Sequence, residues 1–243
     1  MNMIEKFADF MCCNSVEEWR NLLFKYGECF GYEQVLLAIF PDRHTPIEAA
    51  YAFLHSNYSC RWRNKYDSDN LGYVDPVVAH CATKSIPLIW SPEIFADQPQ
   101  KDMYEEACGY GIRSGITFPI HGTKGELGVL CFVTDAKPGK LFQQGACRNL
   151  PELSLLRDFV FETSQRFIKP SCQHEESAPI TQRELECLKW SAAGKTSWET
   201  AQILNCAEAT VNFHINNVRR KFDVNSRRQA IVKAIRLGMI NPT

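Results

Sequence analysis

The chain has 243 residues, of which 45% are hydrophobic and 23% charged, so its composition is that of a globular protein and excludes a disordered, collagen-like or coiled-coil chain. No apolar run of about 18 residues is present, which excludes a membrane-spanning helix. Residues 1–13 lack a signal-peptide pattern, so we expect a cytoplasmic protein without a membrane partner.

The net charge of −1 is the sum of two unequal parts. Residues 1–176 hold 17 Lys/Arg and 23 Asp/Glu, a net charge of −6, whereas residues 177–243 hold 10 Lys/Arg and 5 Asp/Glu, a net charge of +5. A basic module behind an acidic body indicates a nucleic-acid-binding end joined to a domain of another kind.

Eleven cysteines and six histidines are scattered along the chain without zinc-site spacing, and no C-x-x-C pair occurs. Without a secretion signal, the thiols are interpreted as reduced, small apolar residues. We therefore expect neither a metal site nor a cofactor.

The first 168 residues predict strand pairs at both ends, with helices between and after them. A helix is expected to begin after Ser15 and to end at Gly27 or Gly31. Apolar runs predict strands at 34–40, 49–54, 116–120 and 127–134, the last two forming a hairpin through 121–126. Helical periodicity is found near 60–69, 74–83 and 99–111 and over about 141–168. This order predicts an α+β protein whose N-terminal domain, residues 1–168, is an α/β/α sandwich with an antiparallel sheet.

Residues 169–179 are polar and contain two prolines, so they are predicted to be a linker. The remaining segment, 180–243, is predicted to be an all-α domain of four helices. Its first helix begins with a capping box, Thr181 with Glu184, and Gly194 ends that helix. The other three are expected at 196–204, 208–222 and 227–237.

The short second helix, a three-residue turn and the longer third helix form a helix-turn-helix candidate. In the third helix, an apolar stripe is expected to be buried: Val211, Ile215, Val218 and Phe222. The opposite face then presents polar and basic side chains together with one aromatic: Asn212, Phe213, Asn216, Arg219 and Arg220.

The chemistry of that face suits double-stranded DNA. Two asparagines at i and i+4 suit adenine edges, because an amide offers both a donor and an acceptor. The basic residues at the end of the third helix suit phosphates: Arg219, Arg220 and Lys221. The residues at the start of the second helix suit a phosphate as well, because backbone N–H groups are free there: Lys195, Thr196 and Ser197. The spacing alone equally fits a small helical bundle with a solvated face.

Residues 181–222 resemble the LuxR-type helix-turn-helix domain. The matching residues are Glu184, Trp190, Gly194-Lys195-Thr196, Glu199, Ile203, Thr210-Val211-Asn212-Phe213-His214 and Lys221. The resemblance implies that the third helix lies in the major groove, with Thr210 among its DNA contacts, and that the fourth supplies a dimer contact. His214 is either a base reader or a packed core residue.

The acidic domain lacks the strand–helix alternation and acidic cluster of a phosphoacceptor receiver. Its most informative segment is 56–78, in which Tyr58, Trp62 and Tyr66 recur at i, i+4 and i+8 and therefore share one helical face. Asp75-Pro76 follows them. Alone, such a stripe also fits a hydrophobic core, and an aspartate before proline also fits a helix start.

This segment is similar to the autoinducer-binding domain of LuxR-type receptors, which bind N-acyl-homoserine lactones. The similarity continues in Pro87-Leu88-Ile89-Trp90, Glu105-Glu106-Ala107 and Gly115-Ile116-Thr117-Phe118-Pro119. It implies that the Trp62 indole donates to the lactone carbonyl, that Asp75 accepts from the amide N–H, and that Tyr58 donates to the amide carbonyl. Each buried polar group of the ligand needs such a partner, because an unpaired one costs about 1–3 kcal/mol.

The same resemblance places Trp90 near the lactone ring and lines the acyl tail with Leu36, Ala38, Ala52, Leu54, Tyr66 and Val78. Arg63 either reaches a 3-oxo group through water or lies on the surface. Val77 and Cys131 stand where close relatives carry a hydroxyl, whereas Thr117 keeps one. Because a thiol is a weak donor, the preference for chain length and for a 3-oxo group stays open.

These observations predict a quorum-sensing transcription factor that binds an N-acyl-homoserine lactone and then binds a palindromic operator as a homodimer. We expect it to activate transcription together with RNA polymerase. The alternative is an orphan LuxR-type regulator that responds to a different small molecule. An enzyme that acts on the lactone would need a motif such as H-x-H-x-D-H or G-x-S-x-G, and neither occurs, so no catalytic residues are expected.

Overall fold

A computed structural model of the chain describes residues 5–42, 45–168 and 180–240, and the predicted linker lies outside them. The chain divides into two compact units, Met1–Pro170 and Ser171–Thr243. The described residues of each unit have a hydrophobic core of their own.

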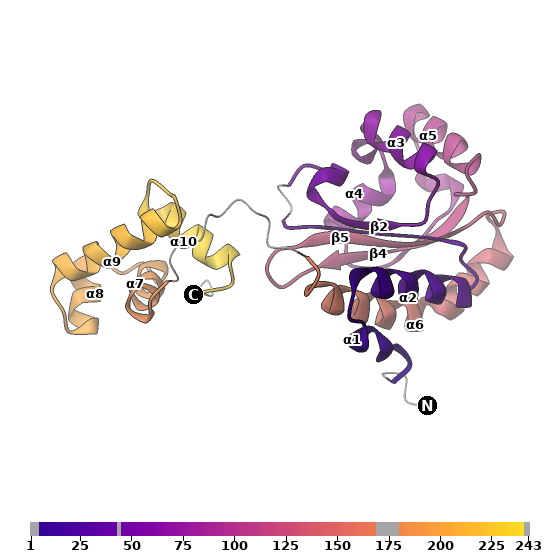
Figure 1. Cartoon of the computed structure of the whole chain (residues 1–243). Helices are drawn as coiled ribbons and strands as arrows, with labels where there is room; N and C mark the ends of the chain where they lie inside the picture. The colour runs from indigo at the N-terminus through magenta and orange to yellow at the C-terminus, as the bar shows by residue number, and fades with distance from the viewer. Residues whose placement is uncertain (1–4, 43–44, 169–179, 241–243) are drawn as a thin grey trace. The chain divides into compact units, whose positions relative to one another are not determined.

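The first unit is built on a five-stranded antiparallel sheet in the order β2-β1-β5-β4-β3 (Figure 1). Its strands are β1 (Gln34–Phe40), β2 (Phe53–Ser56), β3 (Leu88–Ile89), β4 (Ser114–His121) and β5 (Leu127–Thr134). The predicted strands at 34–40 and 127–134 are confirmed with these bounds, and β4 and β5 pair as a hairpin.

Two parts of the sheet differ from the prediction. The strand expected at 49–54 begins only at Phe53, because residues Ala49–Tyr51 form a 3-10 turn. The two-residue strand β3 was not predicted from the sequence. It exists through its pairing with β4, where Leu88 lies opposite Thr117, and such pairing depends on tertiary context rather than on local propensity.

Helices cover both faces of this sheet, which confirms the α/β/α sandwich (Figure 1). Helices α1, α2 and α6 lie on one face and α3, α4 and α5 on the other. Their bounds are α1 (Asp9–Cys12), α2 (Val16–Cys29), α3 (Cys60–Ser68), α4 (Pro76–Thr83), α5 (Gln98–Cys108) and α6 (Lys140–Ser164). Side chains cap three of the helix starts, at Ser15, Asp75 and Asp97.

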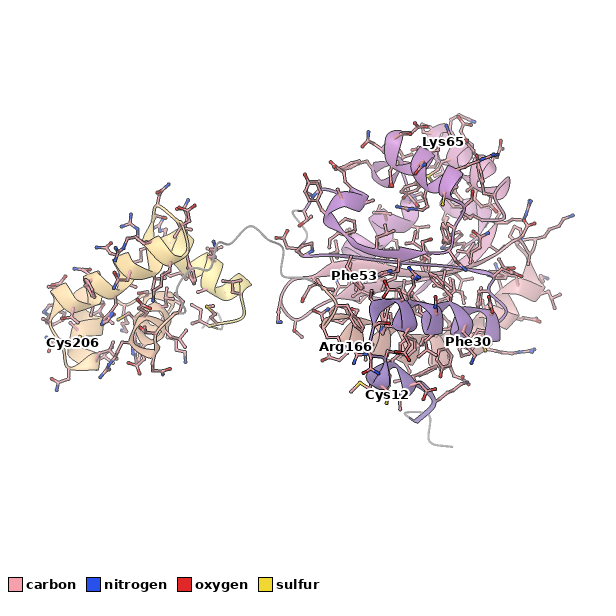
Figure 2. The ribbon with its side chains drawn as sticks, in the orientation of Figure 1. Cys12, Phe30, Phe53, Lys65, Arg166 and Cys206 are labelled. Carbon is pink, nitrogen blue, oxygen red and sulfur yellow. The ribbon has the colours of Figure 1, made fainter. Side chains whose placement is uncertain are left out.

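The short helix α1 is tied to the far end of α6. The Arg166 guanidinium donates from Nη1 to the carbonyl of Met11 at 2.9 Å and from Nη2 to that of Phe10 at 2.6 Å. Arg166 lies near Cys12, the last residue of α1, and both are on the opposite side of the sheet from Lys65 (Figure 2). Phe10 is fully buried in the same hydrophobic cluster as residues of α2 and α6, so this contact holds α1 against that side of the domain.

The sheet register divides the strand side chains between two environments. Leu36, Cys131 and Thr117 lie opposite one another on neighbouring strands and share one face. Because side chains alternate along a strand, Leu37 and Leu130 occupy the other face. That other face packs against α2 and α6 with fully buried residues such as Leu23 and Leu153. We call it the packed face, and the first one the cavity face.

The second unit contains α7 (Gln182–Ala192), α8 (Ser197–Leu204), α9 (Glu208–Lys221) and α10 (Arg227–Arg236), which confirms the four predicted helices. Complete capping boxes begin α7, at Thr181 and Glu184, and α8, at Thr196 and Glu199. The turn between α8 and α9 passes through Asn205 in the left-handed conformation, with φ of 50°. The predicted apolar stripe of α9 is buried in the core of this unit.

Candidate functional site

The cavity face of the sheet encloses a cavity beneath α3, α4 and α5. The volume of this cavity is about 120 Å³, whereas one water molecule needs about 10–15 Å³ on the same measure. The predicted ligand residues line it, except Ala52 and Thr117: Leu36, Ala38, Leu54, Tyr58, Trp62, Arg63, Tyr66, Asp75, Val77, Val78, Trp90 and Cys131. The structure therefore brings together side chains from three strands and two helices.

Almost half of the residues in the cavity wall were not predicted from the sequence: Phe40, Ile47, Glu48, Ala49, Asp67, Phe95, Met103, Tyr104, Ala107, Ile112 and Val129. Some of these carry a usable signal. Phe40 continues the alternation of Leu36 and Ala38, and Val129 lies two residues from Cys131. In contrast, the residues at 47–49 follow no periodic pattern.

Ala52 and Thr117 lie behind the cavity wall. Ala52 packs against the same apolar cluster without lining the cavity. The Trp90 indole donates to Thr117 Oγ1 at 2.9 Å, and Thr117 Oγ1 donates to Cys131 Sγ at 3.2 Å. Burial raises the pKa of the Cys131 thiol to about 12, so it stays protonated near neutral pH. The hydroxyl of Thr117 therefore contacts two residues of the cavity wall, Trp90 and Cys131, without lining the cavity itself.

Gly115 provides the space in which Trp90 packs. A Cβ on Gly115 would lie 3.1 Å from Cδ2 of Trp90 and 3.0 Å from the carbonyl oxygen of Phe132. The Trp90 backbone N–H also donates to the Gly115 carbonyl at 2.8 Å. The indole is therefore held directly against strand β4 and forms part of the cavity wall.

Asp75 places a carboxylate at the cavity wall and caps α4 with the same group. Its Oδ1 accepts from the Val77 backbone N–H at 2.8 Å, and its Oδ2 accepts from the Tyr66 hydroxyl at 2.9 Å. Burial raises the pKa of the Asp75 carboxyl above its usual value, although these two hydrogen bonds oppose the rise. A carboxylate that is desolvated and faces a cavity is suited to accept a hydrogen bond from a ligand.

Tyr58 and Trp62 bring two donors to the same wall. Among the residues that the structure describes, neither the Tyr58 hydroxyl nor the Trp62 indole N–H has a hydrogen-bond partner, and both side chains are buried. Burial holds the pKa of Tyr58 well above its usual value, so the hydroxyl keeps its proton. Donors left without partners in a cavity are suited to carbonyl oxygens of a ligand.

Arg63 lines the cavity and also forms an ion pair. Its Nη2 lies 3.1 Å from Asp67 Oδ1, and its guanidinium lies over the Tyr66 ring at 5.6 Å. With 16% of its side chain exposed, it is mostly buried rather than a surface arginine. Val77, by contrast, contributes only an apolar wall beside the polar groups.

In the second unit, the outward face of α9 carries the predicted polar set. Asn212, Asn216, Arg220 and Thr210 are exposed, and Phe213 exposes 59% of its surface. Residues 211–236 hold seven Lys/Arg and one Asp, so this region is basic. His214 is half-buried with its ring 5.7 Å from Phe213, so it is neither a fully packed nor a fully exposed residue.

Several residues predicted to contact phosphates have partners inside the unit. Lys221 lies 2.7 Å from Glu184, a carboxylate that is 3% exposed, and Lys195 lies 3.6 Å from Glu199. The Thr196 hydroxyl donates to the same Glu199 at 2.9 Å. These contacts stabilise helix starts, and whether the same side chains also contact DNA stays a prediction.

The predicted pairing of both asparagines with adenine requires one free lone pair on each amide oxygen, which has two. Asn212 Oδ1 accepts from the Ser197 hydroxyl at 2.6 Å, and Asn216 Oδ1 accepts from Arg219 Nη1 at 3.0 Å. Ser197 is buried and therefore serves α9 rather than the surface. The asparagines are exposed as expected, and each amide oxygen keeps a second lone pair, so their pairing with adenine stays a prediction.

In the described parts of the chain, no helix combines the length and the hydropathy that crossing a bilayer requires. The sequence matches the family described as "Autoinducer binding domain" over residues 15–164 and the family "Bacterial regulatory proteins, luxR family" over residues 178–234. Both matches are to families of regulators and not to an enzyme class.

Similar transcriptional activator proteins align with nearly the whole chain. The transcriptional activator protein VanR of Vibrio anguillarum is 32% identical over 94% of this chain and 93% of its own length. LuxR of Aliivibrio fischeri is 32% identical over 94% and 89%, respectively.

Solved structures share the fold. Escherichia coli SdiA has a TM-score of 0.77 at 24% identity over 98% of this chain and 97% of its own. SdiA in complex with octanoyl-rac-glycerol has a TM-score of 0.78 at 24% identity, covering 97% and 93%. The chain therefore belongs to the LuxR family of quorum-sensing transcriptional regulators, in which an autoinducer-binding domain precedes a DNA-binding domain.

Proposed function

We propose that this protein is a transcription factor whose autoinducer is an N-acyl-homoserine lactone bound in the cavity of the first unit. The observation that carries the proposal is the polarity of the cavity wall. Two donors without protein partners, on Tyr58 and Trp62, lie in the same enclosure as the carboxylate of Asp75. The lactone offers two carbonyls and one amide N–H, which match two donors and one acceptor.

The apolar part of the wall fits the acyl chain. Leu36, Ala38 and Leu54 line it from the sheet, and Val78 lines it from α4. Arg63 lies close enough to the cavity to bind a substituent on the chain, directly or through water. Ala52 and Thr117 act behind the wall, where Thr117 orients Trp90 and Cys131.

The wider proposal concerns the whole chain. Residues 1–168 form the sensor, 169–179 the linker and 180–243 the DNA-binding domain. Lactone binding stabilises the sensor, because a ligand that binds only the folded state adds its binding free energy to stability. The protein then dimerises, partly through α6, and the two helix-turn-helix modules read a palindromic operator in the cytoplasm, where RNA polymerase is recruited. The lactone is bound and not chemically changed.

A melting experiment on the full chain tests the ligand. Lactones with acyl chains from butanoyl to tetradecanoyl are added, and at least one is expected to raise the melting temperature of the sensor. Absence of a shift with every member of the series would refute the lactone and favour a regulator of a different small molecule.

Asp75 variants separate ligand binding from folding. Asp75→Ala removes the acceptor and also the α4 cap, which by itself costs about 1 kcal/mol. Asp75→Asn keeps a cap oxygen but replaces the other acceptor with a donor. Both variants are expected to lose most of the lactone-induced shift, and only Asp75→Ala is expected to lower the melting temperature of the unliganded protein appreciably.

DNA binding is tested by its salt dependence. The lactone-saturated protein is expected to bind duplex DNA with an affinity that falls steeply with salt, because Lys and Arg release counterions from phosphates. Lys195→Ala is expected to weaken binding to all sequences alike. A salt-independent interaction would contradict the assignment of the basic unit to DNA.

A further inference from the structure

The ligand cavity adjoins a second hollow of the first unit, which we call the outer groove. Its volume is about 250 Å³ on the same measure. Eight residues line it, and four of them are exposed, so the groove is open to solvent: Ile47, Glu48, Ala49, Ala50, Tyr66, Asp67, Asn70 and Gly72. Five of these residues also line the cavity and therefore form a partition between the two spaces: Ile47, Glu48, Ala49, Tyr66 and Asp67.

Two residues of the partition belong to α3 and are held in place by hydrogen bonds. The Tyr66 hydroxyl donates to Asp75 Oδ2 at 2.9 Å. Asp67 Oδ1 accepts from Arg63 Nη2 at 3.1 Å. Because both side chains are engaged, α3 contributes a fixed side of the partition.

The other three residues of the partition lie in the connection between β1 and β2, where Ile47 has the largest apolar side chain. Glu48 is exposed, and Ala49 contributes a single methyl group. A Cβ on Gly72 would lie 2.9 Å from Cγ2 of Ile47, so Ile47 packs directly against the 3-10 turn Leu71–Tyr73. The size of the Ile47 side chain therefore determines how wide the partition is.

The sheet register indicates which end of the ligand meets this partition. Leu36 lies opposite Cys131, and the hydroxyl that accepts from the Trp90 indole donates to Cys131. Phe40 lines the cavity at the other end of β1, where the chain enters the connection that carries Ile47. A lactone ring beside Trp90 therefore directs its acyl chain along β1 toward Phe40 and the partition.

We propose that Ile47 is the residue that limits the acyl-chain length of the ligand, by separating the cavity from a groove that accommodates the end of a longer chain. Each methylene that the cavity buries increases affinity about fourfold, and this gain stops where the chain meets Ile47. The inference rests on the proposed lactone-binding function and specifies which acyl chains the same cavity accepts.

A lactone series tests the limit. The affinities of lactones from butanoyl to hexadecanoyl are measured by melting curves of the full chain and of Ile47→Ala. This substitution makes room for about two methylene groups, so the acyl-chain length with the highest affinity is expected to increase by about two carbons. Ile86→Ala is the matched control, because Ile86 is 66% exposed and lines neither space, and its preference is expected to stay unchanged.

The outcomes of this series separate the inference from the proposed function. An unchanged chain-length preference in Ile47→Ala, with lactone binding retained, would overturn the inference. Absence of binding by every lactone to the unaltered protein would instead refute the proposed function.

A second substitution tests whether the longer chain enters the outer groove. Ala50 is exposed and lines the groove but not the cavity. Ala50→Phe alone is therefore expected to leave the chain-length preference unchanged, whereas in the Ile47→Ala background it is expected to restore the original preference. A double variant that keeps the preference of Ile47→Ala would overturn the role of the groove.

Lactones with a hydroxyl on the last carbon of the chain test the surroundings of that carbon. In the unaltered protein, the hydroxyl is buried against apolar side chains, so it is expected to weaken binding of the preferred chain about tenfold. In Ile47→Ala, the end of the longer preferred chain reaches a groove open to solvent, so the same hydroxyl is expected to change affinity less than about twofold. An equal loss of affinity in both proteins would overturn the inference.

Discussion

The two faces of the central sheet carry the same kinds of apolar residue, but one face is tightly packed and the other lines a cavity. On the packed face, Leu130 is fully buried among side chains of α2 and α6. One position along the same strand, Val129 points the other way and lines a cavity. The packed face thus stabilises the domain by itself, whereas the cavity face leaves apolar surface for a ligand to cover.

The polar groups follow the same division. On the packed face, the Trp19 indole N–H donates to Thr163 Oγ1 at 2.9 Å. On the cavity face, the Trp62 indole N–H has no partner among the described residues. A donor that lines the cavity without a protein partner is available to a ligand carbonyl, so the comparison locates where ligand binding adds stability.

The largest expected effect is on stability, from neighbouring residues of β5. Leu130→Ala leaves a cavity in the packed face and should lower the free energy of unfolding by about 2–5 kcal/mol. Val129→Ala enlarges an existing cavity and should lower it by about 1 kcal/mol. Scanning calorimetry of the full chain measures both, and equal losses would remove the distinction between the faces.

The second effect separates ligand affinity from stability. Trp62→Phe removes a donor that only a ligand uses, so lactone affinity should fall tenfold or more, which is about 1–2 kcal/mol. Trp19→Phe should instead lower stability by about 1 kcal/mol and leave affinity unchanged. Melting curves over a lactone titration measure both quantities, and a loss of affinity in Trp19→Phe would argue against the division.

A smaller effect concerns the thiol in the cavity wall. Cys131→Ser replaces a weak donor by a hydroxyl that still accepts from Thr117, so lactone affinity should rise about fivefold. Cys81→Ser is the control, because Cys81 is buried outside the cavity wall. A lactone titration of both variants suffices, and an unchanged affinity in Cys131→Ser would place the thiol away from the polar groups of the ligand.

The smallest effect is a pH dependence of binding. Burial raises the pKa of Asp75, so acid protonates this carboxyl more readily than an exposed one. The amide N–H of the ligand favours the ionised form, so lactone affinity should decrease as the pH is lowered toward that pKa. Asp75→Asn should abolish the dependence. A higher affinity at the lower pH would reverse the assigned role.

Periodic segments were predictable from the sequence because their burial follows from spacing alone. The strand at 34–40 and the buried stripe of α9 are of this kind. The tyrosine and tryptophan positions of α3 required the family resemblance as well, because an aromatic stripe also fits a core. The contribution of Ile47 to the wall was not predictable, since it depends on how a non-periodic loop folds back.

The hydrogen-bond partners of the polar side chains were not predictable from the sequence. Asn212 is 15 residues from Ser197, which is 30 residues from Arg227, so the hydrogen bonds that join the three side chains exist only in the folded unit. In the same way, the position of Thr117 behind the wall follows from the packing of Trp90 and not from local pattern. Spacing identified the exposed residues but not their hydrogen-bond partners.

Gly115 lies behind the wall, yet it limits the shape of the ligand that the cavity accepts. A methyl group at this position would crowd the Trp90 ring and the carbonyl oxygen of Phe132 at once, so the ring would have to shift. Because this ring lines the cavity and donates to Thr117 at 2.9 Å, a shift would change the shape of the cavity and disturb that hydrogen bond. Because the side chain of Gly115 is a single hydrogen atom, Trp90 fits against strand β4, and this fit sets both the width of the cavity and the alignment of Trp90 with Thr117.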